Sequence, residues 1–158
     1  MGMLARILRT GRVAEPAPDR PSPLEAAEQF RGSLALRHVD AGSCNGCEIE
    51  ISGCFSPVYD AERYGIRLVA SPRHADGLLV TGVVTHNMSS ALQATYAAAP
   101  APKVVVAIGD CAHDCGLLAG GPGVAGPVSD FVPVDVTVPG CPPSPEQIID
   151  ALRRVSGR

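Results

Sequence analysis

Four cysteines stand at positions from which they could bind one metal cofactor together. Cys44 and Cys47 form the pair C-N-G-C, Cys111 lies in GDCAHDCG, and Cys141 lies in PGCPPSPE. Thiolates are soft ligands that favour zinc or iron–sulfur clusters. Structural zinc sites usually combine two C-x-x-C pairs, whereas here one pair is joined by two single cysteines. The pattern therefore predicts one iron–sulfur cluster.

Three other interpretations of these thiols remain open. The chain could be a structural zinc module without a redox role, or the four thiols could be unrelated buried side chains. A thioredoxin-like dithiol at Cys44 and Cys47 would leave Cys111 and Cys141 unexplained. Of the two remaining cysteines, Cys54 is expected to be a packed small hydrophobe. Cys115, four residues after Cys111, is a possible substitute ligand, although Cys111 lies nearer to the preceding strand.

Alternating strands and helices are predicted to position the cysteines. Apolar runs predict strands over residues 34–39, 65–70, 77–81, 103–108 and 131–138, and helices are predicted over 48–59, 89–99 and 146–155. This alternation predicts an α/β fold, an open and mostly parallel sheet with helices on both faces. Ligand sites in such sheets lie outside the carboxyl ends of the strands, and the cysteines follow the first, fourth and fifth strands. They are therefore expected to meet at one edge. Glycines beside them would allow a bulky cofactor to approach the backbone, namely Gly42, Gly46, Gly109 and Gly140.

Composition and charge limit the function further. The chain has 158 residues, 46% of them hydrophobic, which predicts one globular domain over residues 34–158. Residues 1–33 are basic and then Pro-rich, and they are interpreted as an N-terminal arm. A formal net charge of −3 does not favour binding to nucleic acid. The arm lacks the long apolar stretch of a signal peptide, so a cytoplasmic location is expected.

The motifs around the cysteines resemble those of a known family. DAGSCNGCEIEI, FSPVYDAERYGIRLVASPRHADGLLVTGVVT, GDC and VDVTVPGCPPSPEQI are similar to the small subunit of membrane-bound, energy-converting [NiFe] hydrogenases of the formate hydrogenlyase type. That family is related to the 20 kDa cluster-bearing subunit of respiratory complex I. The resemblance spans about residues 34–155. It implies a flavodoxin-like fold and one [4Fe-4S] cluster on Cys44, Cys47, Cys111 and Cys141.

The resemblance also implies a function and partners. The chain would relay electrons between a ferredoxin-type iron–sulfur subunit and a nickel–iron large subunit. Membrane-embedded subunits would hold the complex at the inner face of the cell membrane. Complex I homologues have two adjacent cysteines where this chain has the split pair, which favours the hydrogenase branch. The alternative is a complex I-type quinone oxidoreductase. Only 17 residues follow Cys141, so a single cluster is expected.

No residue of this chain is expected to make or break substrate bonds. Glu48, directly after Cys47, is a candidate proton relay, or else an ordinary acidic residue in the first turn of a helix. His74 is a candidate for redox-linked protonation. His38, within the first strand, is expected to be structural.

Overall fold

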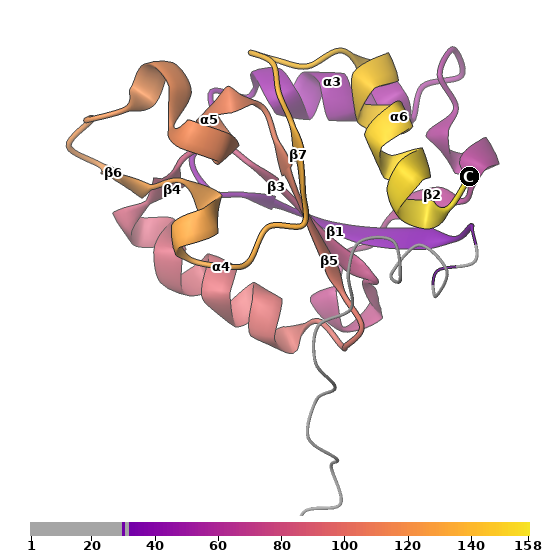
Figure 1. Cartoon of the computed structure of the whole chain (residues 1–158), viewed down its shortest axis with the longest axis horizontal. Coiled ribbons are helices and arrows are strands. Elements are labelled where there is room, and N and C mark those ends of the chain that lie inside the picture. Colours follow the sequence, from indigo (N-terminus) through magenta and orange to yellow (C-terminus); the bar gives the residue numbers. More distant parts are fainter. Residues whose placement is uncertain (1–29, 31) are drawn as a thin grey trace, which may run out of the picture.

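A five-stranded parallel sheet forms the centre of the molecule in the computed structural model, which describes residue 30 and residues 32–158 (Figure 1). Its strands are β1 (Leu34–Asp40), β2 (Ile66–Leu68), β3 (Gly77–Thr81), β5 (Val104–Ile108) and β7 (Val136–Val138). Their order across the sheet is β2-β1-β3-β5-β7, and every neighbouring pair is parallel. If only the five strands of this sheet are numbered in chain order, their spatial order is 2-1-3-4-5, which is that of flavodoxin-like folds. The predicted fold class is confirmed.

Helices cover both faces of this sheet (Figure 1). On one face lie α3 (Gly46–Cys54) and α6 (Pro145–Ser156), and on the other lie α4 (His86–Ala98) and the short α5 (Asp110–Asp114). Side chains alternate between the faces because successive strand residues point in opposite directions. In β3, Leu79 packs towards α3 and α6, whereas Leu78 and Val80 pack towards α4. Each face therefore has its own apolar core.

The aliphatic run VVVAI shows why this sheet forms. All five residues of β5 are buried, as are all five of β3. Strands buried on both faces are rich in branched aliphatic residues, as expected for a parallel sheet between helices. Gly77 pairs with Val104 in the register, and a Cβ at Gly77 would lie 2.3 Å from the Val104 carbonyl oxygen. Glycine is needed there because the two strands come too close together for a side chain.

Several elements differ from their predicted bounds. Helix α3 ends at Cys54 rather than near Tyr59, and Phe55 follows in a turn. Strand β7 begins at Val136 rather than at Phe131, because a 3-10 turn, η4 (Val128–Asp130), and a loop precede it. The sequence did not predict α5 or the small antiparallel ribbon of β4 (Val84–Thr85) and β6 (Val124–Gly126). The same holds for three short 3-10 helices, η1 (Ala61–Tyr64), η2 (Pro72–His74) and η3 (Gly116–Leu118).

The predicted N-terminal arm lies almost wholly outside the described residues. Residue 30 and residues 32–33 are described, and Phe30 is buried in the core beneath α6. The Gly32 amide donates a hydrogen bond to the Ser156 carbonyl at 2.9 Å. The division at residue 33 stays a prediction. Across the described part of the chain, no helix combines the length and apolar character needed to cross a bilayer.

Candidate metal centre

The four predicted ligands line one pocket at the carboxyl edge of the sheet. It has a volume of about 60 Å³ and is lined by Ser43, Cys44, Gly46, Cys47, Gly82, Asp110, Cys111, Gly140, Cys141 and Pro142. Cys44 and Cys47 come from the segment after β1, Cys111 from the one after β5, and Cys141 from the one after β7. Parallel strands end at a common edge, so residues far apart in sequence meet there. Which of these thiols bind iron stays a prediction.

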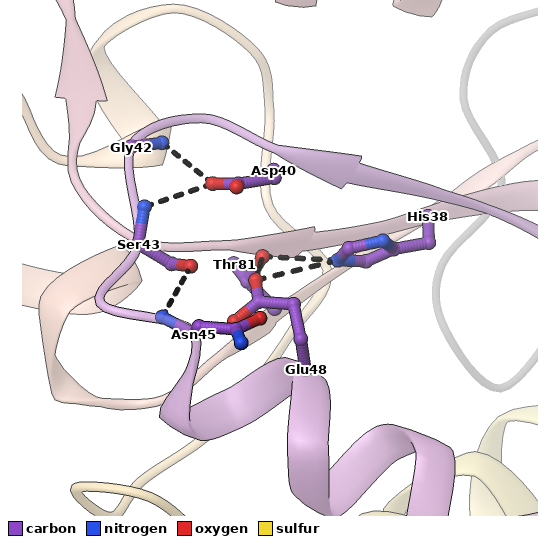
Figure 2. A network of polar contacts seen from close by, with 7 residues as sticks. All are labelled: His38, Asp40, Gly42, Ser43, Asn45, Glu48 and Thr81. Atoms are coloured by element: carbon purple, nitrogen blue, oxygen red, sulfur yellow. Dashed lines mark hydrogen bonds and ion pairs between the residues drawn. The ribbon is translucent and has the colours of Figure 1, made fainter.

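The loop after β1 is held by side chains that cap its own backbone (Figure 2). Asp40 Oδ1 accepts hydrogen bonds from the Gly42 amide at 2.9 Å and the Ser43 amide at 2.8 Å. Ser43 Oγ in turn accepts from the Asn45 amide at 3.0 Å. Asn45 adopts a left-handed conformation, with φ 71°, which asparagine tolerates better than most residues. The chain then enters α3, so Cys47 lies in the first turn of that helix.

The other two cysteine loops are tied to each other through Asp110. Its amide donates to the Gly140 carbonyl at 2.9 Å, and its Oδ1 accepts from the Gly140 amide at 2.7 Å. This double contact fixes the segment that carries Cys111 against the segment that carries Cys141. Asp110 also lines the pocket. The sequence reasoning missed this role, although an aspartate directly before a cysteine in a glycine-flanked loop was visible in the motif GDC.

Glycines leave room for the sulfur atoms. Gly109 has φ 86°, and a Cβ there would lie 2.7 Å from Cys47 Sγ. Gly116 has φ 45°, and a Cβ there would lie 3.3 Å from Cys111 Sγ. Both positions combine a backbone conformation that side chains rarely adopt with a close approach to a thiol. The backbone therefore forms a cradle that any side chain at these positions would narrow.

Burial and negative neighbours oppose ionisation of the thiols in the metal-free chain. Burial raises the pKa of Cys47 to about 12, with further contributions from the negative charges of Glu48 and the other three pocket cysteines. Burial also raises the pKa of Cys111, with Cys141 as the next cause. None of the described residues that line the pocket is Lys, Arg or His. A metal cofactor, when bound, would supply positive charge that favours the thiolate form of these cysteines.

The donor set consists of four thiols, which suit a metal cofactor that takes sulfur ligands. Cys44 and Cys141 are exposed, Cys111 is partly buried and Cys47 is buried, so the thiols surround a hollow. Among residues 30 and 32–158, no three His, Cys, Asp or Glu side chains converge on a point where one metal ion could be held.

The two remaining cysteines are not among the described residues that line the pocket. Cys54 is 1% exposed and packs between α3 and α6, with its Sγ 3.6 Å from the Pro145 carbonyl oxygen, as the sequence predicted. Cys115 ends α5 in a left-handed conformation, with φ 70°, and is buried outside the described lining of the pocket. Burial raises its pKa, followed by Asp114 and Asp130 and not by the pocket cysteines. Cys111 lines the pocket and Cys115 does not, and the choice of Cys111 as the ligand stays a prediction.

Glu48 belongs to a polar network that the sequence did not predict (Figure 2). Its side chain rises from α3 towards β1 and β3, where Thr81 Oγ1 donates a hydrogen bond to Glu48 Oε1. His38 Nε2 lies 3.0 Å from Thr81 Oγ1 and 3.6 Å from Glu48 Oε1. Glu48 Oε2 is buried and makes no hydrogen bond within the described part of the chain. His38 is thus part of a network next to a predicted ligand.

His74 occupies the opposite edge of the sheet. It ends η2, which precedes β3, whereas the cysteines follow the carboxyl ends of the strands. Because β3 is parallel to β1 and β5, the start of β3 lies a full strand length away from the pocket. The structure therefore does not bring His74 to the cysteines.

A family model and known proteins match this chain. The model of the NADH ubiquinone oxidoreductase 20 kDa subunit matches residues 44–155. A probable membrane-bound hydrogenase subunit of Pyrococcus furiosus is 51% identical over 115 residues, which cover 73% of this chain and 69% of that protein. Formate hydrogenlyase subunit 7 of Escherichia coli is 47% identical over 118 residues, 75% of this chain but only 46% of that subunit.

A solved structure agrees with the fold. A chain of the membrane-bound sulfane sulfur reductase, an archaeal respiratory membrane complex, superimposes with a TM-score of 0.71. It is 33% identical in sequence, and the match covers 85% of this chain and 74% of that one. The family model, which matches residues 44–155, includes all four pocket cysteines in its matched region.

Proposed function

The chain belongs to the NADH ubiquinone oxidoreductase 20 kDa subunit family, and from that premise we propose that it is an electron-relay subunit carrying one [4Fe-4S] cluster. It is a subunit of a membrane-bound hydrogenase or of a complex I-like oxidoreductase. The observation that carries the proposal is the single pocket lined by Cys44, Cys47, Cys111 and Cys141.

The protein's part in this function is to hold the cofactor and to set its surroundings. Four thiolates would bind the iron atoms, and the cluster, when bound, accepts and donates one electron at a time. Gly109 and Gly116 carry no Cβ, which leaves the space beside the sulfur atoms open. Pro142 lines the pocket beside Cys141. Hydrogen bonds and solvent exclusion are the means by which a protein adjusts the potential of a cluster.

The four-thiol pocket contains no group arranged to break a substrate bond. Its described lining offers thiols, glycines, one serine, one proline and Asp110, and Asp110 is occupied by the Gly140 amide. Substrate chemistry would therefore belong to a partner subunit. The contribution of this chain would be to set the reduction potential of its cluster and to hold the cluster at its place along an electron path.

We infer that the complex is of the hydrogenase type. The similar proteins of P. furiosus and E. coli are named as subunits of a membrane-bound hydrogenase and of formate hydrogenlyase. The split pair Cys44 and Cys47 supports the same branch, since complex I homologues have adjacent cysteines there. In this proposal a ferredoxin-type subunit delivers electrons and a nickel–iron large subunit receives them, at the cytoplasmic face of the membrane.

The complex I-type quinone oxidoreductase is the second candidate, because the matching family model is that of a complex I subunit. The partner distinguishes the two. The complex would be purified through a tag on this chain, and the largest co-purifying subunit would be sequenced. A hydrogenase large subunit has two C-x-x-C pairs for nickel, and their presence is the expected result. A partner without those pairs would refute the hydrogenase assignment while leaving the cluster untouched.

Metal analysis tests the cofactor separately. The full chain would be purified without oxygen and assayed for iron, acid-labile sulfide, zinc and nickel. We expect about four iron and four sulfide per chain, as one [4Fe-4S] cluster requires. Zinc without iron would overturn the electron-relay proposal and favour a structural zinc module.

A further inference from the structure

Strand β7 leaves one edge of the central sheet open. It is last in the order β2-β1-β3-β5-β7, and among the described strands it pairs with β5 only. The Asp135 amide donates to the Val105 carbonyl at 2.9 Å, so the backbone of Asp135 is directed towards β5. Successive residues of a strand direct their amide and carbonyl groups to opposite sides, so those of Val136 are directed away from the sheet. An open edge of this kind can accept a further strand.

A hollow borders this edge on each face of the sheet. The first has a volume of about 210 Å³ and lies between β7 and α6, with Thr137, Asp150 and Arg154 in its lining. The second has a volume of about 180 Å³ and lies between β7, α5 and η4, with His113, Ser129 and Thr137 in its lining. We call them the α6-side hollow and the α5-side hollow. Thr137 borders both, because β7 runs between α5 and α6 (Figure 1).

The two hollows match the alternating side chains of an added strand. Val136 and Val138 pack into the core on the α6 face, so Thr137 lies on the α5 face. A strand beside β7 would place one side chain in the α5-side hollow, next to Thr137, and the side chains before and after it towards the α6-side hollow. Its backbone would form hydrogen bonds with Val136. Peptides recognised by strand addition bind in this way, with main-chain hydrogen bonds for affinity and alternate pockets for specificity.

Negative charge surrounds the α5-side hollow. Asp135 lines it, and Asp114 and Asp130 directly follow two other lining residues, His113 and Ser129. Helix α5 contacts η4, so both of these exposed aspartates lie at the rim of the hollow. No Lys or Arg is among its described lining residues, and neither Asp114 nor Asp130 forms an ion pair within the described part of the chain. A basic side chain would complement this hollow.

A second copy of this chain would not complement it. Two β7 strands related by a two-fold axis would pair antiparallel, which puts both α5-side hollows on one face of the joined sheet. The aspartates of the two copies would then repel one another, and each copy would offer only the uncharged Thr137 to the other's hollow. Pro133 and Pro139 have no amide hydrogen and lie on either side of the open stretch, so the segment that fits is short.

We propose that the β7 edge binds a short extended segment of another subunit, added as a sixth strand beside Val136, with a Lys or Arg side chain in the α5-side hollow. The similar proteins of P. furiosus and E. coli are named as subunits, so other chains are available to supply it. This inference goes beyond the electron relay and does not depend on the cofactor, because none of the predicted cluster ligands lines either hollow.

Photo-cross-linking in the whole complex tests the proposal. Asp150 lines the α6-side hollow and its side chain is 60% exposed, so it can be replaced by p-benzoylphenylalanine with little effect on the fold. The complex would be purified through a tag on this chain and irradiated, and the linked peptide would be sequenced by mass spectrometry. We expect one cross-link to another subunit, at a residue next to a Lys or Arg. No cross-link, a link to a second copy of this chain, or a linked segment without a basic residue would overturn the proposal.

Val136→Pro, made in the same cross-linking background, tests the backbone contact. Proline is tolerated in an edge strand where the amide faces outward, so this variant removes the hydrogen-bond donor offered to the added strand and should lose the cross-link. Leu68→Pro is the matched control on the opposite edge strand, β2. The Val69 amide donates to the Leu36 carbonyl at 2.9 Å, so the Leu68 amide is directed outward there, and this variant should keep the cross-link. A cross-link retained in Val136→Pro would overturn the proposal.

Charge reversal gives a second measurement that stays informative if Val136→Pro does not fold. Asp114→Lys and Asp130→Lys change exposed residues and should each lower the cross-link yield by about two- to fivefold, as loss of an exposed charge pair does. Glu62→Lys changes an exposed acid in η1, outside both hollows, and should keep the yield. An undiminished yield in both aspartate variants would overturn the assignment of a basic side chain to the α5-side hollow.

Discussion

The substitution Gly109→Ala adds one methyl group beside the cysteine pocket. Gly109 has φ 86° and ψ 160°, a region almost confined to glycine, and holding alanine there costs about 1–3 kcal/mol. The new Cβ would lie 2.7 Å from Cys47 Sγ and 3.3 Å from the Gly140 carbonyl oxygen. Overpacking of this kind costs about another 1–3 kcal/mol. We expect the free energy of unfolding to fall by about 2–6 kcal/mol in total.

The effect on the cofactor should be larger than the effect on stability. The Cys47 sulfur can escape the methyl group only by turning away from its position, and that sulfur is a predicted iron ligand. We therefore expect Gly109→Ala to lose most of its iron and its cluster EPR signal. Iron content and EPR of the reduced chain measure the first effect, and urea unfolding of the metal-free chain measures the second.

Gly120→Ala is the control. Gly120 has a similar φ of 77°, but a Cβ there would have no atom within 4 Å. It should cost only the backbone strain of about 1–2 kcal/mol and leave the cluster unchanged. If Gly109→Ala kept its full iron content and lost no more stability than Gly120→Ala, the view of Gly109 as a cradle for the sulfur would be refuted.

Three other perturbations separate the pocket from the rest of the fold. The metal-free chain should lose stability as the pH rises above about 9. Burial raises the pKa of Cys47 from its ordinary value of 9.0 to about 12, so the thiol ionises more easily in the unfolded chain. The free energy of unfolding should therefore fall by up to about 1.4 kcal/mol per pH unit. Urea unfolding at several pH values measures this slope, which should be shallower in Cys47→Ser; an unchanged slope would contradict the buried-thiol account. Cys115→Ser should keep the cluster EPR signal and Cys111→Ser should lose it, and the reverse outcome would make Cys115 the ligand. Leu92→Ala, on the buried side of α4, should lower the free energy of unfolding by about 2–5 kcal/mol without altering the EPR spectrum, whereas a changed spectrum would mean that the two faces of the sheet are coupled.

The sheet was predictable from local patterns. The run VVVAI and the apolar segment at 77–81 are fully buried strands, and β3 has the predicted bounds. A capping box was also readable: Ser144 Oγ accepts from the Gln147 amide, and Gln147 Oε1 accepts from the Ser144 amide, at the start of α6. Because strands of this kind end at a common edge, the meeting of the four cysteines followed from the order of the elements alone.

What could not be predicted depends on contacts between distant segments. His38 and Thr81 are 43 residues apart, and only the register of β1 against β3 brings them together. Glu48 reaches them because α3 crosses the same face of the sheet. The short α5 is too brief to show a helical period in the sequence, and its length is fixed by Cys115 turning left-handed after it. The sequence thus indicated the four thiols of the pocket but not the contacts that His38 makes beside it.

EPR spectroscopy of the reduced full chain, combined with iron analysis, tests the central claim most directly. The wild-type chain and Cys54→Ala should show the same [4Fe-4S] spectrum with about four iron atoms per chain. Cys141→Ala, which removes a thiol from the pocket lining, should show neither the spectrum nor that iron content. A wild-type chain without an iron–sulfur signal, or a Cys141→Ala chain that retains it unchanged, would contradict the claim that one cluster is held by Cys44, Cys47, Cys111 and Cys141.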